Sequence, residues 1–274
     1  MSRPLFPYVT HPCWTEDLRH VWERIHLPVA PRCNVKCVFC DRRGGTSCHM
    51  PVPGRAWRTM EVPEALRRLE EELRRRPRLR IVAVSGPGEP LYNDATLALM
   101  HAVRRRHSDL EFCLSTNGLL LESFVKELST LGLHAITVSV HAVDPEIVEK
   151  AYEWVKIDGI RIKTGFGEEV ISRQIRGIRE AAAFGIHVKV NTVLMPDINA
   201  GHIESVARVM SEAGAKIQNI MPLVPCGALC GGRAPTPDEL ARARQAASAY
   251  IDQFLGCKLC RSDVVGIPGF DTVL

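Results

Sequence analysis

Residues 31–41 read PRCNVKCVFCD, and they place Cys33, Cys37 and Cys40 with three and then two residues between them. The motif follows an apolar segment, IHLPVAP at 25–31, which has the composition of a buried strand. Three thiolates can hold three irons of a [4Fe–4S] cluster and leave the fourth iron for a ligand from outside the motif. Cysteine pairs also make tetrahedral zinc sites, so zinc is the alternative for these residues.

The composition indicates a globular protein. The chain has 274 residues, 46% of them hydrophobic and 24% charged, which is enough to bury a full core. Charges interrupt every apolar run before about 18 residues, and the start of the chain lacks a secretory signal, so we expect a cytoplasmic protein with no membrane span. Ten cysteines favour metal binding or redox chemistry over disulfides. The net charge of +4 is mild, and we expect no nucleic-acid partner.

Short apolar segments alternate with amphipathic ones along the chain, which is typical of βα units. We therefore expect an α/β fold, a partial (β/α)6 parallel barrel. The expected strands are 25–31, 80–85, 110–116, 134–140, 186–194 and 216–223, and each should be followed by a helix. Helix starts are expected at Asn93, Asp144 and Thr236, and helix ends at Gly132, Gly185 and Gly214.

Polar side chains recur on one face of the expected strands, since neighbouring side chains in a strand point to opposite faces. A barrel packed solid would carry branched aliphatic residues there, so the pattern predicts a lumen that holds a ligand. A partly solvated outer surface is the alternative. The residues on this face are Cys113, Ser115, Thr137, Ser139, His141, Lys189, Asn191, Asn219 and Met221.

The cysteine motif, with the aromatic Phe39 before its last cysteine, resembles that of the radical S-adenosylmethionine superfamily. In that superfamily the amine and carboxylate of S-adenosylmethionine bind the fourth iron. The sequence GPGEP at 86–90 follows a strand and resembles the amine-binding motif, in which Gly86 and Gly88 allow close approach and Glu89 supplies the carboxylate. The remaining strand ends look like a cradle for the cofactor, although each alone also fits an ordinary strand end: Ser115, Asn117, Ser139, Asn191 and Met221.

Motifs along nearly the whole chain resemble the NifB family of nitrogenase cofactor maturases. They are HPCWTEDLRH, RIHLPVAPRCN, GPGEPL, AVDPEI, VKVN, NIMPL and CKLCRSDVVG. The resemblance implies a carbide synthase that methylates and fuses two [4Fe–4S] substrate clusters, K1 and K2, into the [8Fe–9S–C] precursor of the iron–molybdenum cofactor. It also implies a cluster donor, an electron donor such as a ferredoxin, a product carrier or cofactor scaffold, and an anaerobic or oxygen-protected setting.

Other functions stay open on the sequence alone. Another radical S-adenosylmethionine enzyme with auxiliary clusters would share the cysteine motif and the C-terminal cysteines. A non-enzymatic cluster carrier would bind iron without cleaving S-adenosylmethionine, and a zinc-stabilised binding protein would hold no iron.

The resemblance also assigns ligands for the substrate clusters. Cys13, Cys48 and Cys113 match the K1 ligands, and Cys257 and Cys260 match the K2 ligands. His26 is the candidate nitrogen ligand of K1, with His11 as the second choice, although a lone histidine is more often structural. Candidate proton acceptors are Glu16, His26 and Glu89.

The expected organisation is an N-terminal extension at 1–24, a partial barrel at 25–223, and a C-terminal helix at 236–255 with a cluster-binding tail, at 224–274. We expect a stand-alone form without the carrier-like C-terminal domain of longer members. Two features depart from the family. The loop at 41–48 is slightly longer than usual, which affects the assignment of Cys48. Cys226 and Cys230 form an extra pair that fits a spare ligand set, an inert loop or a divergent paralogue.

Overall fold

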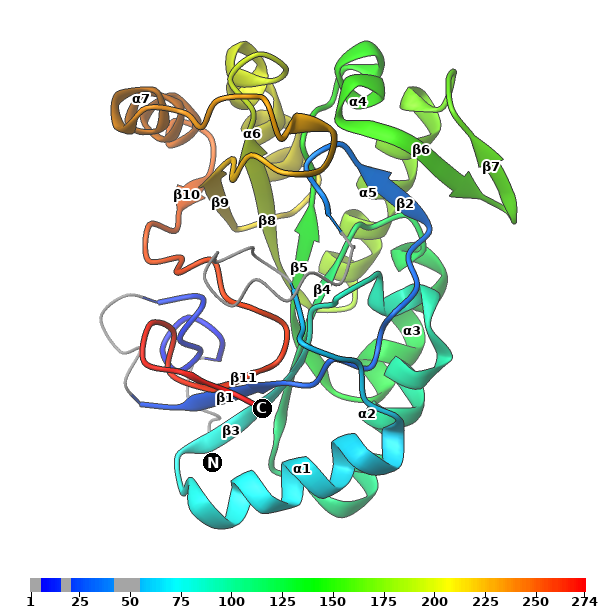
Figure 1. The fold of residues 1–274 in the computed structure, drawn as a ribbon, viewed down its shortest axis with the longest axis vertical. Coiled ribbons are helices and arrows are strands. Elements are labelled where there is room, and N and C mark those ends of the chain that lie inside the picture. Colours follow the sequence, from blue (N-terminus) through cyan, green and yellow to red (C-terminus); the bar gives the residue numbers. More distant parts are fainter. Residues whose placement is uncertain (1–5, 16–20, 42–54) are drawn as a thin grey trace.

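The central sheet contains the strands that the sequence predicts. The computed structural model describes residues 6–15, 21–41 and 55–274, and within them six predicted strands lie side by side, parallel and in sequence order (Figure 1). They are β1 (Glu23–His26), β3 (Leu79–Val84), β4 (Glu111–Thr116), β5 (Leu133–Ser139), β8 (His187–Leu194) and β9 (Ile217–Pro222). The sheet is open, with the short strands β10 (Asp252–Gln253) and β12 (Thr272–Val273) at its edges, so the parallel α/β fold is confirmed.

The first strand is shorter than predicted. It ends at His26 instead of residue 31, since Pro28 has no N–H group to continue the ladder. The chain beyond it still follows the neighbouring strand, because Leu27 N donates to Ala83 O at 3.0 Å. This extended segment leads directly into the cysteine motif.

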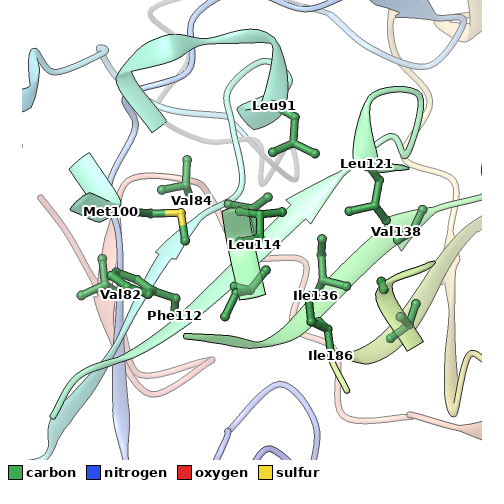
Figure 2. Close-up of a cluster of buried hydrophobic side chains, with 14 of the residues drawn as sticks. Val82, Val84, Leu91, Met100, Phe112, Leu114, Leu121, Ile136, Val138 and Ile186 are labelled. Carbon is green, nitrogen blue, oxygen red and sulfur yellow. The ribbon is translucent and has the colours of Figure 1, made fainter. Parts of the chain in front are cut away.

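Helices cover one face of the sheet (Figure 1). They are α1 (Val62–Arg75), α2 (Asp94–Arg106), α3 (Leu121–Thr130), α4 (Pro145–Ala151), α5 (Gly167–Ala183), α6 (Ile203–Glu212) and α7 (Pro237–Ala247), with 3₁₀ turns η1 (Pro90–Tyr92), η2 (Ala200–His202) and η3 (Gly227–Leu229). Figure 2 shows the apolar face of the sheet, where Phe112 and Leu114 of β4 lie near Met100 of α2. Burial of such side chains stabilises the fold by about 1.5–3 kcal/mol each.

Most predicted helix boundaries are confirmed. Asp144 caps α4, Thr236 forms a capping box with Glu239 at α7, and glycines with positive φ follow α3, α5 and α6. The helix predicted at 236–255 was too long. It ends at Ala247, and the chain then extends as β10 beside β9, which lets Phe254 N donate to Gln218 O at 2.8 Å. Phe254 is thereby buried against Trp14.

A small second sheet was not predicted. It contains β2 (Val35–Cys37), β6 (Tyr152–Ile157) and β7 (Ile160–Ile162). Asp158 and Gly159 turn between β6 and β7 with φ of 48° and 85°, which is the backbone of a tight hairpin. An Asp-Gly pair between apolar runs is a strong hairpin signal, so the sequence did contain this information.

The C-terminal tail joins the sheet beside its first strand (Figure 1). The strand β11 (Val264–Gly266) pairs antiparallel with β1, and β12 pairs with β11. The fully buried Arg24 ties this tail down: Nη1 donates to Gly266 O and Nη2 to Asp271 Oδ2, both at 2.6 Å. The predicted division into three regions stays a prediction. Among the described helices, not one has the length and apolarity that a bilayer crossing requires.

We expect Arg24→Met to lower the free energy of unfolding by about 2 kcal/mol, less than for a fully buried ion pair because Asp271 is 18% exposed. The tail from residue 257 onward should become sensitive to proteolysis, which limited digestion and mass spectrometry would measure. Arg78→Met is the control, since Arg78 is 58% exposed and its long contact with Glu23, at 3.5 Å, is worth about 0.5 kcal/mol. Equal tail cleavage in both variants would contradict the role of Arg24.

Candidate functional site

A cavity of about 780 Å³ lies on the polar face of the sheet. Its wall includes the side chains that the strand pattern placed on that face, so the predicted lumen is confirmed. They are Cys113, Ser115, Thr137, Ser139, His141, Lys189, Asn191, Asn219 and Met221. Residues 11–13 and the tail at 256–261 also line this space, so both ends of the chain contribute to it.

Cys33, Cys37 and Cys40 line the cavity, and the backbone that precedes them is held by the turn after β3. Gly88 N donates to Ala30 O at 2.6 Å, and Glu89 N donates to Arg32 O at 2.9 Å. A Cβ atom at Gly88 would lie 2.2 Å from Arg32 O, so only glycine permits this approach. The GPGEP turn is therefore hydrogen-bonded through its backbone to the segment that leads into the CxxxCxxC motif.

The side chain of Asn93 stabilises the contact between the cysteine loop and the GPGEP turn. We predicted Asn93 as a helix cap, and it does precede α2, but its side chain makes no capping bond. Instead Nδ2 donates to Arg32 O at 2.8 Å and to Glu89 O at 2.7 Å, while Oδ1 accepts from Arg32 N at 3.2 Å. The side chain thus joins the cysteine loop to the glutamate turn.

The other side of the cysteine loop pairs with the unpredicted hairpin. Lys156 N donates to Asn34 O at 2.6 Å, and Val38 N donates to Ala151 O at 3.1 Å. Asn34 also accepts from Asn117 Nδ2 at 2.6 Å through its side chain. Tyr152 of the same hairpin lines the cavity. Sequence reasoning missed Asn34 and Tyr152. The Asp-Gly signal could have assigned Tyr152 to a hairpin, whereas no local pattern marked Asn34 within the cysteine motif.

Glu89 is buried, and its carboxylate is held at the ends of β3 and β4. It accepts from Thr116 Oγ1 and Asn117 N, both at 2.6 Å, and from Leu91 N at 3.0 Å. Burial raises the pKa of Glu89 to about 7, although these hydrogen bonds act in the opposite direction. A cationic ligand in the cavity would favour the ionised carboxylate.

The other predicted cofactor residues surround the same space. Phe39, Gly88, Ser115, Asn117, Ser139, Asn191 and Met221 line the cavity, whereas Gly86 is not among its lining residues. Gly86 has φ of 152°, a backbone conformation that favours glycine. Asn219 Nδ2 donates to Asn191 Oδ1 at 3.1 Å, while its buried Oδ1 has no partner within the described ranges and can accept from a ligand.

Cys13 and Cys113 lie near each other and near a buried cation. Burial and then the charge of Cys13 together raise the pKa of Cys113 to about 12, and the charges of Lys189 and Arg24 oppose this shift. Lys189 Nζ donates to Cys13 O at 2.7 Å and lies 5.3 Å from the centre of a ring of Trp14. The positive charge would favour thiolates and an anionic group bound to them.

Two histidines accompany these thiols. His26 forms a hydrogen bond between Nδ1 and Ser85 Oγ at 2.8 Å, which leaves Nε2 as the nitrogen able to bind a metal. Burial lowers its pKa well below the usual value, so the ring is neutral, as a ligand must be. His11 Nδ1 accepts from Cys13 N at 3.1 Å, and no described residue partners its Nε2.

Cys257 and Cys260 reach the cavity from the C-terminal tail. Burial raises the pKa of Cys260 to about 12, and Arg24 opposes this by donating from Nη2 to Cys260 Sγ at 3.0 Å. The charge of Cys13 raises the pKa of both Cys113 and Cys260, so these thiols lie within electrostatic reach of one another. Cys48 and Glu16, the other candidates, lie outside the described residues.

The donor set, thiols from three parts of the chain around one cavity, fits iron–sulfur clusters. Within the described ranges, no group of three His, Cys, Asp or Glu side chains is placed to hold one metal ion. A [4Fe–4S] cluster binds each thiolate at a different iron, so its ligands stand further apart. Buried thiols with raised pKa values, such as those of Cys113 and Cys260, would release protons when iron binds.

Comparison with known proteins agrees with this geometry. Residues 27–210 match the profile of the Radical SAM superfamily. The chain is 38% identical to FeMo cofactor biosynthesis protein NifB of Methanocaldococcus jannaschii, over 96% of this chain and 88% of that protein. It is 37% identical to the Methanocaldococcus infernus protein of that name, over 94% and 85%, and 36% identical to the one from Klebsiella pneumoniae, over 95% and 57%.

Solved structures share the fold at low identity. The radical S-adenosylmethionine methyltransferase TsrM from Kitasatospora setae has a TM-score of 0.53 and 16% identity, over 79% of this chain and 41% of that one. Native anSMEcpe with bound AdoMet has a TM-score of 0.50 and 18% identity, over 73% and 51%. These likenesses support the fold alone.

We expect Asn93→Ala to lower the free energy of unfolding by about 2 kcal/mol, because it removes the three hydrogen bonds that the Asn93 amide makes to Arg32 and Glu89. Chemical unfolding of the anaerobic protein would measure this. Asp94→Ala is the matched control, since Asp94 is exposed and contributes only to the first turn of α2. If Asn93→Ala lowers the free energy of unfolding no more than Asp94→Ala does, the hydrogen bonds of Asn93 to Arg32 and Glu89 do not stabilise the fold.

Glu89 should make the stability of the cluster-free protein depend on pH. Its pKa is about 7 in the fold and 4.5 when unfolded, so the folded state holds the proton more tightly. Its contribution to the free energy of unfolding is therefore complete below pH 4.5 and falls by about 1 kcal/mol per pH unit as the pH rises toward 7. In Glu89→Gln this fall in the free energy of unfolding between pH 4.5 and 7 should be absent, because the amide does not titrate. Parallel stability curves for the two proteins between pH 5 and 7 would contradict it.

Proposed function

The chain belongs to the NifB family of the radical SAM superfamily, and on that premise we propose that it is a carbide synthase of nitrogenase cofactor assembly. It would methylate and fuse two [4Fe–4S] substrate clusters, K1 and K2, into the [8Fe–9S–C] precursor of the iron–molybdenum cofactor. One observation carries the proposal: three separate groups of thiols, from the cysteine loop, from Cys13 with Cys113, and from the tail, line the same cavity.

Cys33, Cys37 and Cys40 would hold the resident [4Fe–4S] cluster, and the GPGEP turn would bind S-adenosylmethionine beside it. A [4Fe–4S] cluster held there would supply the electron for reductive cleavage of S-adenosylmethionine. The ionised Glu89 would bind the amine of the cofactor, and Asn93 keeps the turn in contact with the cysteine loop. The orphaned Oδ1 of Asn219 is a further acceptor in this cradle.

The substrate clusters would occupy the rest of the cavity. K1 would bind Cys13, Cys113 and Cys48, the last outside the described residues, with His26 as its nitrogen ligand. K2 would bind only the two thiolates of Cys257 and Cys260. Two thiolates are few ligands for a cluster, which suits a substrate that must leave. Thiolate-bound clusters are anionic, and the buried charges of Arg24 and Lys189 lie beside these thiols to compensate them.

The remaining roles follow from the same assignment. Glu89, and His26 when it is not bound to K1, are candidates to accept protons as the methyl carbon becomes carbide, since both line the cavity. The proposed partners are S-adenosylmethionine, an iron–sulfur cluster donor, an electron donor such as a ferredoxin, and a product carrier or nitrogenase cofactor scaffold. An anaerobic or oxygen-protected cytoplasmic setting would suit clusters and thiolates that oxidise in air.

The proposal predicts that methyl transfer and fusion separate by mutation. Replacing both Cys257 and Cys260 with Ala should abolish S-adenosylhomocysteine formation, because the methyl acceptor loses its ligands. Cys113→Ala should keep S-adenosylhomocysteine and lose the fused product, since only K1 is affected. The measurement is anaerobic turnover with S-adenosylmethionine and dithionite, in which S-adenosylhomocysteine and 5′-deoxyadenosine are quantified separately. The fused product is assayed by whether it activates cofactor-free nitrogenase.

Cys40→Ala is the control for cleavage and should form no 5′-deoxyadenosine. If the Cys257 and Cys260 double variant forms S-adenosylhomocysteine at the parent rate, the methyl acceptor lies elsewhere. Radical cleavage by the parent protein without any fused product would favour another radical S-adenosylmethionine reaction.

A further inference from the structure

Cys226 and Cys230 belong to none of the three thiol groups assigned above. They flank the single turn η3, between β9 and α7. Their spacing, with three residues between the thiols, equals that of Cys33 and Cys37. Two thiolates at such a spacing can bind two corners of one [4Fe–4S] cluster.

The turn is docked on the cysteine loop. Ala228 N donates to Val38 O at 2.8 Å, and the Cys226 thiol donates to Phe39 O at 2.7 Å. Gly227 has φ of 62°, and a Cβ atom there would lie 2.8 Å from Val38 O. The chain thus places a glycine where any other residue would push the two cysteines away from the loop.

The two thiols differ in their exposure. Cys226 is half-buried and lines the cavity, whereas Cys230 is exposed and is not among the lining residues. The turn therefore carries one thiol in the wall and one at the outer surface, beside the loop of Cys40. A cluster that binds both thiols would stand at the rim of the cavity.

We propose that Cys226 and Cys230 form a loading site, which holds an incoming [4Fe–4S] cluster by two corners and passes it to the thiols inside. This rests on the proposed function, in which the cavity must receive clusters as substrates. The transfer is ligand exchange without oxidation or reduction. Two thiolate–iron bonds form as two of the donor's thiolates leave with the protons of Cys226 and Cys230. Two cavity thiols then displace the outside thiolates from the other two irons and protonate them. These small thiols take the irons of Cys226 and Cys230 and return the two protons to those cysteines.

The site is suited to release as well as capture. Two protein thiolates leave two irons with ligands from outside the chain, so the cavity thiols can attack there without prior dissociation. When the cluster has moved on, the Cys226 thiol regains its proton and its hydrogen bond to Phe39 O. Cys230 returns to solvent, where an exposed thiol is well hydrated.

The test uses the full-length, cluster-free protein and a synthetic [4Fe–4S] cluster with four small thiolate ligands as the probe. Loading is followed anaerobically by its visible absorption, and iron and sulfide are counted at the end. Replacing both Cys226 and Cys230 with Ser should slow loading roughly tenfold or more, since transfer from the rim is intramolecular and benefits from a high effective concentration. The final content should stay at about twelve irons per chain, from three clusters.

Two further variants keep the result interpretable. Cys230→Ser alone cannot disturb the core, because Cys230 is exposed, and it should slow loading by a smaller factor. Ala228→Ser changes the same turn without touching a thiol and should load at the parent rate.

An unchanged rate in the double variant would overturn the proposal. A final content lower by about four irons would also overturn it, because the pair would then hold a permanent cluster. Failure of the proposed function looks different: the parent protein itself would stop at about four irons, and the loading rate of that one cluster would still report on Cys226 and Cys230.

Discussion

The backbone of the cysteine loop satisfies few of its hydrogen bonds within the loop, and the rest of the site depends on this constraint. A loop that presents three thiols to one cluster cannot be a helix or a long strand, yet its buried N–H and C=O groups need partners. Three distant elements supply them: the turn at Gly88 and Glu89, the strand β6, and the turn at Cys226. The positions of the thiols are therefore set by the whole fold, and not by the loop alone.

The two faces of the sheet have different roles: one packs the hydrophobic core and the other forms the wall of the cavity. One face is apolar and packs against helices, as Figure 2 shows for β3, β4 and β5. The other carries thiols and polar side chains, which a helix could not cover without burying unpaired groups. Residues 11–13 and the C-terminal tail border this face instead, and Arg24 fastens the tail through Gly266 and Asp271. The same guanidinium contacts Cys260, so the fastening of the tail and the charge balance of the site are coupled.

Several elements of the site could be predicted from local pattern. The alternation of side chains placed Cys113, Ser139 and Asn191 on the face that forms the cavity. The order of strand, cysteine motif and GPGEP turn placed both motifs at one end of a parallel sheet, where they do meet. These features depend on the two-residue period of a strand and on the direction of a parallel sheet, and both are properties of short segments.

By itself the sequence determined the strand order, the helix boundaries at Asp144 and Thr236, and the identity of the thiols. Only the tertiary structure decided that Asn93 clamps two loops instead of capping α2, and that the chain after Ala247 extends so that Phe254 meets Trp14. It also decided that Cys226 lies on Phe39, 187 residues away in the chain. The physical reason is that a polar side chain binds whichever buried group lacks a partner, and which group that is depends on how distant segments pack.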